Sequence, residues 1–210
     1  MISYQRAIEQ LAHDLGVDPH EFARYASETQ VGGRDTNHGW AAMAMHDVEC
    51  RLLYATVRAL KPDAVIEIGT AEGCTATHIL TALTNNQYGE LFSYDIDINA
   101  GHRIPKILRD RWHFECADAL DVPWIDLYSD YNRVLVFEDG PHTYPWTRDM
   151  HEAIRFFIKP DVMITHDYYT HLTYPDFAVQ QSCEEIYGDE VKGLHIEGAF
   201  TGLGYWISTL

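Results

Sequence analysis

The hydrophobic and polar positions of this chain follow two alternating periods. Short apolar runs that end in a polar residue have the length of buried strands, and the segments between them repeat apolar residues every three or four positions, as amphipathic helices do. Strands are predicted at residues 65–68, 90–95, 113–116, 133–138, 162–165, 194–199 and 204–208. Helices are predicted at residues 3–15, 18–25, 43–60, 75–83, 146–158 and 177–187. This alternation is typical of a parallel, doubly wound α/β sheet.

The first 47 residues differ in pattern from the rest of the chain. Two short helices are followed by Gln30–Trp40, a polar stretch punctuated by three glycines. Such a loop is either a lid that closes over a neighbouring site or a plain surface connection, and both interpretations stay open here. We expect residues 1–47 to form an N-terminal helical extension with this candidate lid, and residues 48–210 to form one domain that carries the site.

Length and charge restrict the classes of partner. The 210 residues suit one α/β domain with a sizeable core, and 32 acidic against 15 basic residues give a formal net charge of −17. This charge argues against nucleic acid and membrane partners, because phosphate binding draws on clustered Lys and Arg. One local basic cluster runs against the trend: His102, Arg103, Lys106, Arg109 and Arg111. We expect a small-molecule substrate.

The cysteines and the amino terminus indicate a soluble, cytoplasmic protein. Cys50, Cys74, Cys116 and Cys183 are far apart and form no C-x-x-C pair, which argues against a zinc ribbon or a disulfide framework. The first residues are too polar for a signal peptide, and no window approaches the ~18 apolar residues of a membrane span. The oligomeric state stays open, and a homo-oligomer is one alternative.

The stretch Val65–Thr75 reads as a strand, a tight turn and the start of a helix. Gly69 and Gly73 would let the backbone approach a ligand, and the free N–H groups of the new helix would face it. An acid inside the turn, Glu72, would repel a diphosphate, so a zwitterionic or cationic nucleoside fits better. The alternative is an ordinary turn whose glycines serve packing.

The pattern Glu67-x-Gly69-x-x-x-Gly73 resembles motif I of class I S-adenosylmethionine (SAM) methyltransferases, in the variant of small-molecule O-methyltransferases. The resemblance implies a mostly parallel, seven-stranded, Rossmann-like sheet with an antiparallel edge hairpin, which the last two predicted strands would form. It also implies SAM as the cofactor. The cofactor contacts expected in the motif are Glu67, Gly69, Thr70, Gly73 and Thr75.

Two further acids follow predicted strands. Asp95 comes 26 positions after Gly69 and ends the second strand, where a carboxylate can accept both ribose hydroxyls of a nucleoside. Asp118 follows the third strand, where methyltransferases of this kind usually place an adenine contact. An alternative role for Asp118 is to cap a helix that starts at Ala119.

The fourth and fifth predicted strands deliver a second set of polar residues to the same sheet edge. Asp139-Gly-Pro-His142-Thr-Tyr144 and, about 25 residues later, His166-Asp167 are similar to metal-dependent sugar O-methyltransferases of macrolide biosynthesis and to cephalosporin-hydroxylase-like relatives. This resemblance covers roughly Val48 to the carboxyl end. It implies that Asp139 holds a divalent cation and takes part in catalysis, that His142 is the general base and that Asp167 is a second ligand.

The chemistry of the hydroxyl group supports these assignments. A sugar or catechol hydroxyl is weakly acidic, so a cation that stabilises the alkoxide and a nearby base would promote methyl transfer. Two carboxylates and water suit Mg²⁺ or Mn²⁺. The family typically has two carboxylates or Asp-Asn at this second pair, whereas the chain has His166-Asp167-Tyr168. A histidine ligand would favour Mn²⁺, Fe²⁺ or Zn²⁺ over Mg²⁺, or the site would have no metal.

The sequence therefore predicts a SAM-dependent O-methyltransferase that acts on a hydroxyl of a sugar or another small natural product with the help of a divalent cation. Two alternatives stay open. One is a SAM-binding enzyme of other chemistry, such as SAM cleavage or metal-dependent hydroxylation. The other is a SAM-binding module without catalytic activity that regulates a partner.

Overall fold

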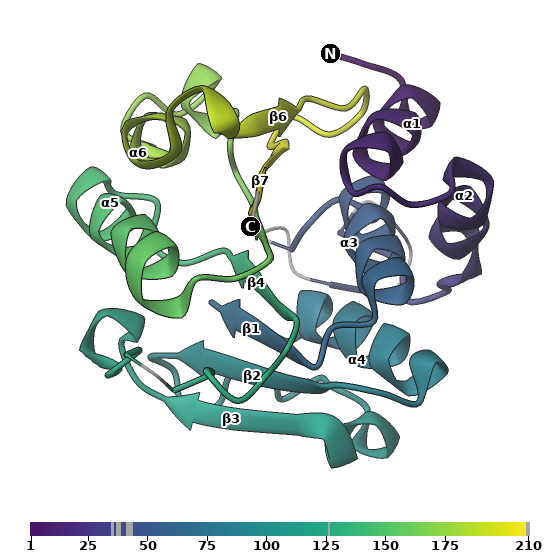
Figure 1. Ribbon diagram of the computed structural model, residues 1–210, viewed down its shortest axis with the longest axis horizontal. Coiled ribbons are helices and arrows are strands. Elements are labelled where there is room, and N and C mark those ends of the chain that lie inside the picture. The colour runs from purple at the N-terminus through teal and green to yellow at the C-terminus, as the bar shows by residue number, and fades with distance from the viewer. Residues whose placement is uncertain (35, 37–38, 41–43, 126, 209–210) are drawn as a thin grey trace.

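The computed structural model describes residues 1–34, 36, 39–40, 44–125 and 127–208, and these form one seven-stranded sheet with helices on both faces (Figure 1). The strands are β1 (Ala64–Ile68), β2 (Glu90–Asp95), β3 (Trp112–Cys116), β4 (Val134–Glu138), β5 (Val162–Thr165), β6 (Lys192–Leu194) and β7 (Leu203–Ile207). The α-helices are α1 (Tyr4–Asp14), α2 (Pro19–Glu28), α3 (Asp47–Leu60), α4 (Cys74–Asn86), α5 (Tyr144–Ala153) and α6 (Val179–Tyr187). Shorter helical segments are η1 (Lys106–Arg111), η2 (Ala119–Asp121), η3 (Ile154–Ile158), η4 (Thr170–Leu172) and η5 (Gly188–Glu190).

The strand order is β3-β2-β1-β4-β5-β7-β6. Strands β1 to β5 are parallel, and β7 and β6 are antiparallel to their neighbours, so the predicted doubly wound sheet with an antiparallel edge pair is confirmed. The chain order is not the spatial order at this edge, because β7 lies between β5 and β6. This arrangement agrees with the Rossmann-like sheet that the sequence predicted.

Two predicted element boundaries were wrong. The strand predicted at 194–199 is β6 at Lys192–Leu194, and the residues after it form the connection to β7. Apolar and polar residues alternate at 194–197, as in a strand, but Ile196 makes only an isolated parallel bridge to Ile2, and Gly198 turns the chain with φ +89°. The helix predicted at 43–60 begins at Asp47, because His46 and Glu49 form a capping box there; its expected start, Met43, lies outside the described residues.

The core has two halves, one on each face of the sheet. Successive residues of a strand point to opposite faces, so Val65 of β1 packs with α1 to α4 whereas Ile66 packs with α5, η3 and α6. Leu135 and Val136 of β4 divide in the same way. Both central strands are fully buried, as the continuous apolar runs of a parallel sheet require.

The N-terminal helices α1 and α2 share the first half of this core. Phe22 is fully buried, and the hydroxyl of Tyr205 in β7 donates to Asp14 Oδ2 at 2.6 Å. Residues 35 and 37–38 of the expected lid lie outside the described residues. No described helix has the length and apolar character needed to cross a bilayer.

The register aligns the ends of three neighbouring strands. Ile68 of β1 lies opposite Glu138 of β4, which lies opposite Thr165 of β5. The residue that follows each strand extends this alignment, so that Gly69, Asp139 and His166 lie in a row. Two backbone hydrogen bonds fix it, from Asp139 N–H to the Ile68 carbonyl at 2.8 Å and from His166 N–H to the Glu138 carbonyl at 2.9 Å.

Candidate functional site

A buried carboxylate stabilises the turn after β1 through hydrogen bonds. Glu67 is fully buried and accepts hydrogen bonds from the hydroxyls of Thr70 at 3.0 Å, Thr75 at 2.8 Å and Ser93 at 2.6 Å. Burial raises the pKa of Glu67 to about 7, although the three hydroxyls act in the opposite direction. Glu67 thus organises the turn and the start of α4 and is not one of the residues that line the pocket above.

The two glycines of the turn have a packing reason. A Cβ on Gly69 would lie 2.1 Å from the Asp139 carbonyl oxygen, and a Cβ on Gly73 would lie 2.5 Å from Ile104 Cγ1. Both residues have positive φ, at +85° and +98°, which favours glycine independently. The sequence analysis expected a ligand to approach the backbone at these two glycines. Other atoms of the protein lie at both Cβ positions instead.

A pocket of about 290 Å³ opens above this turn at the carboxyl edge of the sheet. It is lined by six of the residues predicted for the site: Gly69, Thr70, Thr75, Asp95, Asp118 and Asp139. Its lining also contains residues that the sequence analysis did not assign to the cofactor: Met45, Tyr94, Ile96 and Trp146. This mixture of apolar walls and a few convergent polar groups is typical of a small-molecule site.

The acids predicted to contact a nucleoside have partners within the protein. Asp95 Oδ2 accepts from the backbone N–H groups of Thr70 at 2.8 Å and Ala71 at 2.9 Å, so Asp95 ties the end of β2 to the glycine turn. Asp118 Oδ1 accepts from the Leu120 N–H and from Trp146 Nε1, each at 3.0 Å. Asp118 therefore caps η2, as the alternative interpretation proposed, and also borders the pocket.

A cluster of charged side chains lies beside the pocket where β4 and β5 end. His166 is buried, and its Nδ1 lies 3.1 Å from Asp139 Oδ1 and 3.3 Å from Asp167 Oδ2. Its Nε2 lies 3.3 Å from Oε2 of Glu49, which is fully buried in α3. Burial alone would lower the pKa of His166, but the facing carboxylates raise it well above the ordinary value.

His142 lies on the other side of the same carboxylates. Its Nε2 is 3.1 Å from Asp167 Oδ2 and 3.5 Å from Asp139 Oδ1, and its ring stacks on Phe177 with centroids 4.7 Å apart. This nitrogen is buried and has no hydrogen-bond partner of proper geometry among the described residues. Burial lowers the pKa of His142, and the two aspartates reverse this effect and raise it.

The two aspartates are kept ionised by the same histidines. Burial would raise the pKa of Asp139, but the charges of His166 and His142 and the hydrogen bond from His166 hold it far below its ordinary value. The pKa of Asp167 is also lowered, against burial, by His166. Asp167 has a φ of +56°, an unfavourable conformation for a residue with a side chain, which turns its carboxylate toward the histidines.

These residues fit a divalent cation. Ligand atoms of Asp139, His166 and Asp167 lie within 4.8 Å of one another, and two carboxylates with one imidazole suit Mn²⁺ or a related ion. As a ligand, His166 would be neutral, and its Nε2–H would donate to Glu49, which is the usual arrangement of a metal-bound histidine. The sequence analysis missed Glu49, because it lies inside the helix predicted at 43–60 and belongs to no local motif.

Residues 66–168 match a protein-family model described as a methyltransferase domain. The chain therefore carries a methyltransferase domain of the class I type. The matched region of this methyltransferase contains the turn, Asp95 and Asp118, and it ends just after His166 and Asp167. No curated protein shows significant sequence similarity to the chain.

Solved structures of methyltransferases share the fold. CalS11, a TDP-rhamnose 3'-O-methyltransferase of calicheamicin biosynthesis, is similar with a TM-score of 0.60 and 14% identity over 99% of this chain and 93% of its own. The methyltransferase PaMTH1 of Podospora anserina, solved with S-adenosylhomocysteine bound, has a TM-score of 0.57 and 12% identity over 91% and 89%. A structure of CmcI with Mg and SAM has a TM-score of 0.51 and 15% identity over 74% and 69%.

Proposed function

We propose that this protein transfers the methyl group of SAM to a hydroxyl of a small molecule, most specifically a sugar or a polyol-bearing natural product, with a divalent cation at Asp139, His166 and Asp167. The observation that carries the proposal is the row Gly69, Asp139 and His166, which sets a nucleoside-sized pocket directly beside a cluster of carboxylates and histidines. A methyl donor and a hydroxyl activated for attack need this adjacency.

The cofactor would occupy the pocket over the glycine turn. Its aromatic and aliphatic walls, Tyr94, Ile96 and Trp146, suit an adenine ring, and Asp95 at the end of β2 suits the ribose. The acids around the pocket favour a sulfonium over a diphosphate. PaMTH1 with S-adenosylhomocysteine and CmcI with SAM support this assignment.

His142 is the residue placed to take the hydroxyl proton. As the oxygen of the acceptor forms its bond to the methyl carbon and the carbon–sulfur bond breaks, the proton would pass to Nε2 of His142, the nitrogen without a hydrogen-bond partner in the described structure. Asp139 and Asp167 would orient the imidazole and stabilise its charged form. A cation held by Asp139, His166 and Asp167 would act as a Lewis acid that stabilises the alkoxide.

A second hollow supports a polar acceptor. It is lined by the ring of Phe177, which stacks on His142, and by polar side chains of α6 that include Gln180 and Glu184. Amide and carboxylate groups can hydrogen-bond several hydroxyls of one ligand. A sugar-like molecule could thus rest against α6 with one hydroxyl directed to His142.

The test is transfer from methyl-labelled SAM to a panel of sugar nucleotides, glycosides and catechols, with and without chelator. We expect transfer that chelator abolishes and Mn²⁺ or Mg²⁺ restores, and His142→Ala should lower kcat by about 10² or more while calorimetry shows unchanged SAM binding. His113→Ala, at an exposed histidine paired with Glu90, is the matched control and should keep full activity. Full transfer in excess chelator would refute the role of the cation, and SAM cleavage without transfer would refute the reaction.

A further inference from the structure

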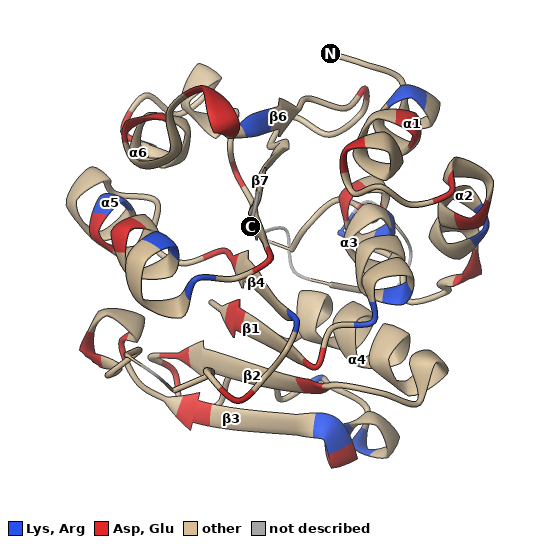
Figure 2. Ribbon diagram, in the orientation of Figure 1, with Lys and Arg blue, Asp and Glu red and all other residues tan. Residues whose placement is uncertain are grey.

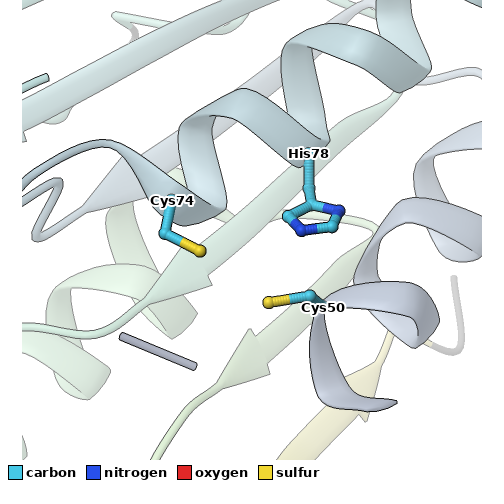
Figure 3. A group of neighbouring side chains, drawn as sticks. All are labelled: Cys50, Cys74 and His78. Atoms are coloured by element: carbon cyan, nitrogen blue, oxygen red, sulfur yellow. The ribbon is translucent and has the colours of Figure 1, made fainter. Parts of the chain in front are cut away.

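A second cluster of metal-ligating side chains lies behind the glycine turn, between α3 and α4. Cys50 comes from α3, and Cys74 and His78 are four residues apart on one face of α4. Their exposed fractions are 0%, 5% and 0%, and their ligand atoms lie within 4.8 Å of one another. Figure 3 shows that the three side chains point into the same space.

The two thiols of this cluster have different surroundings. Cys74 is the first residue of α4, where the helix dipole and free N–H groups favour a thiolate. The hydrogen bond from Cys50 lowers the pKa of Cys74 to about 6; His78 acts in the same direction and burial opposes both. Burial raises the pKa of Cys50 well above its ordinary value. A dication balances two buried thiolates, since together with a neutral imidazole they form a cluster without net charge.

A backbone oxygen already lies at ligand-like distances from two of these donors. The Gly32 carbonyl oxygen is 3.1 Å from His78 Nε2 and 3.8 Å from Cys74 Sγ. Ordinary zinc bond lengths and tetrahedral angles give edges of ~3.4 Å between nitrogen and oxygen and ~3.6 Å between sulfur and oxygen. The observed spacing is therefore close to that of three ligands around one ion.

The other nitrogen of His78 has a partner that can hold the ring orientation. Its Nδ1 lies 3.2 Å from the hydroxyl oxygen of Thr29, a buried residue. With the ring proton on Nδ1, His78 donates to this hydroxyl and turns the lone pair of Nε2 toward the thiols. A second-shell hydrogen bond of this kind fixes the tautomer of most metal-bound histidines.

We propose that Cys50, Cys74 and His78 bind one thiophilic divalent cation, Zn²⁺ or a similar ion, with the Gly32 carbonyl or a water in the fourth position. Thiolate and imidazole ligands select zinc over magnesium, so this site differs in chemistry from the carboxylate cluster. The ion would join α3 to the first turn of α4. Because Cys74 also lines the cofactor pocket, the site would stiffen the wall of that pocket. The inference does not depend on the methyl acceptor.

Cobalt titration of the wild-type protein tests the proposal without any substitution. Protein reduced and stripped with chelator is titrated anaerobically with Co²⁺, and we expect one equivalent to give a thiolate-to-cobalt charge-transfer band and the intense visible bands of tetrahedral cobalt. Zn²⁺ should abolish both and raise the unfolding temperature. Weak octahedral bands alone would overturn the proposal, since they report an oxygen-rich site such as the carboxylate cluster.

Variants locate the ion. Cys50→Ala and Cys74→Ala should lose the charge-transfer band, and Thr29→Val should weaken zinc binding by about 10- to 100-fold, the usual effect of removing a second-shell partner. The matched control is Cys183→Ala, because Cys183 is also buried beside a histidine, with Sγ 3.2 Å from His151 Nε2. It should keep the band. A band that persists in both Cys50→Ala and Cys74→Ala would overturn the proposal, as would an intact mass that shows a Cys50–Cys74 disulfide and no metal uptake after reduction.

Discussion

Three glutamates of this protein are fully buried, and each has a different set of partners. Glu67 is surrounded by hydroxyls, Glu49 faces His166 and a threonine, and Glu138 lies 3.5 Å from Nε2 of His151. Burial raises the pKa of Glu67, and the hydroxyl donors do not offset this effect of burial. For Glu138 the effect of His151 outweighs that of burial, so the pKa of Glu138 is lowered. The kind of partner therefore decides whether the pKa of Glu67 or Glu138 is raised or lowered in the core.

The first prediction concerns the stability contributed by Glu67. Because its folded pKa of about 7 lies above the ordinary 4.5, the folded state retains a proton that the unfolded state releases. The contribution of protonated Glu67 to the free energy of unfolding is therefore fully present below the ordinary pKa. It is lost as the pH rises through 7, and the loss amounts to roughly 3 kcal/mol at most. Glu67→Gln cannot ionise, so its free energy of unfolding should increase relative to wild type between pH 5 and pH 8. Urea denaturation of both proteins at several pH values measures this difference, and a constant difference would contradict it.

The second prediction concerns Glu49 as a positioning residue for His166. Glu49→Gln keeps an acceptor for the hydroxyl of Thr201, which lies 3.0 Å away, but removes the charge that holds the Nε2–H of His166. We expect Mn²⁺ affinity, measured by electron paramagnetic resonance, to fall by about 10- to 100-fold with little change in stability. Glu90→Gln, in the exposed pair with His113, should bind Mn²⁺ as the wild type does. Equal affinities in both variants would leave Glu49 a purely structural residue.

At the scale of elements, the site is a consequence of strand register. The ends of β1, β4 and β5 could be predicted from apolar runs that stop at a polar residue, and this prediction already brought Asp139, His142, His166 and Asp167 to one edge. What the pattern could not show is which elements pack over that edge from elsewhere in the chain. Trp146 of α5 closes the pocket through a contact with Gly140 that depends on the angle between strand and helix, which local periodicity does not record.

The turn between β1 and α4 provides a prediction at this scale. Gly69→Ala would add left-handed strain and also force a Cβ against the Asp139 carbonyl, whereas Gly198→Ala, with a similar φ of +89°, adds strain where nothing lies within 4 Å. Gly198→Ala should cost about 1 kcal/mol and Gly69→Ala at least ~2 kcal/mol more. Chemical denaturation compares the two. Equal losses would show that the turn can move away from β4, and the row at the strand ends would then not be rigid.

At the scale of the whole molecule, the arginines of the local basic cluster have partners within the chain. Acidic residues occur on helices of both layers (Figure 2), and the guanidinium groups of the basic cluster are directed to the chain itself. Arg103 donates to Glu72, Arg109 to the Ile104 carbonyl and Arg111 to the Gly89 carbonyl. The contacts of Arg103 and Arg109 brace the loop that packs on the glycine turn, whereas the contact of Arg111 lies at the opposite edge of the sheet, before β2. With a formal charge of −17, we still expect no affinity for nucleic acid.

The last prediction concerns the N-terminal helices α1 and α2, which unfold either together with the sheet or separately from it. Phe22 of α2 is fully buried in the same core half as α3, α4 and the central strands. Its truncation in Phe22→Ala should therefore lower the stability of the entire chain, by about 3–5 kcal/mol. The exposed Phe157, at 49% exposure, provides the matched control, and Phe157→Ala should change stability by less than about 0.5 kcal/mol. Far-ultraviolet circular dichroism and tryptophan fluorescence should give coincident urea transitions for both variants, because one shared core unfolds as a unit. An early helical transition in Phe22→Ala, with an unchanged main midpoint, would instead show that residues 1–28 form a separate layer on an independently stable methyltransferase domain.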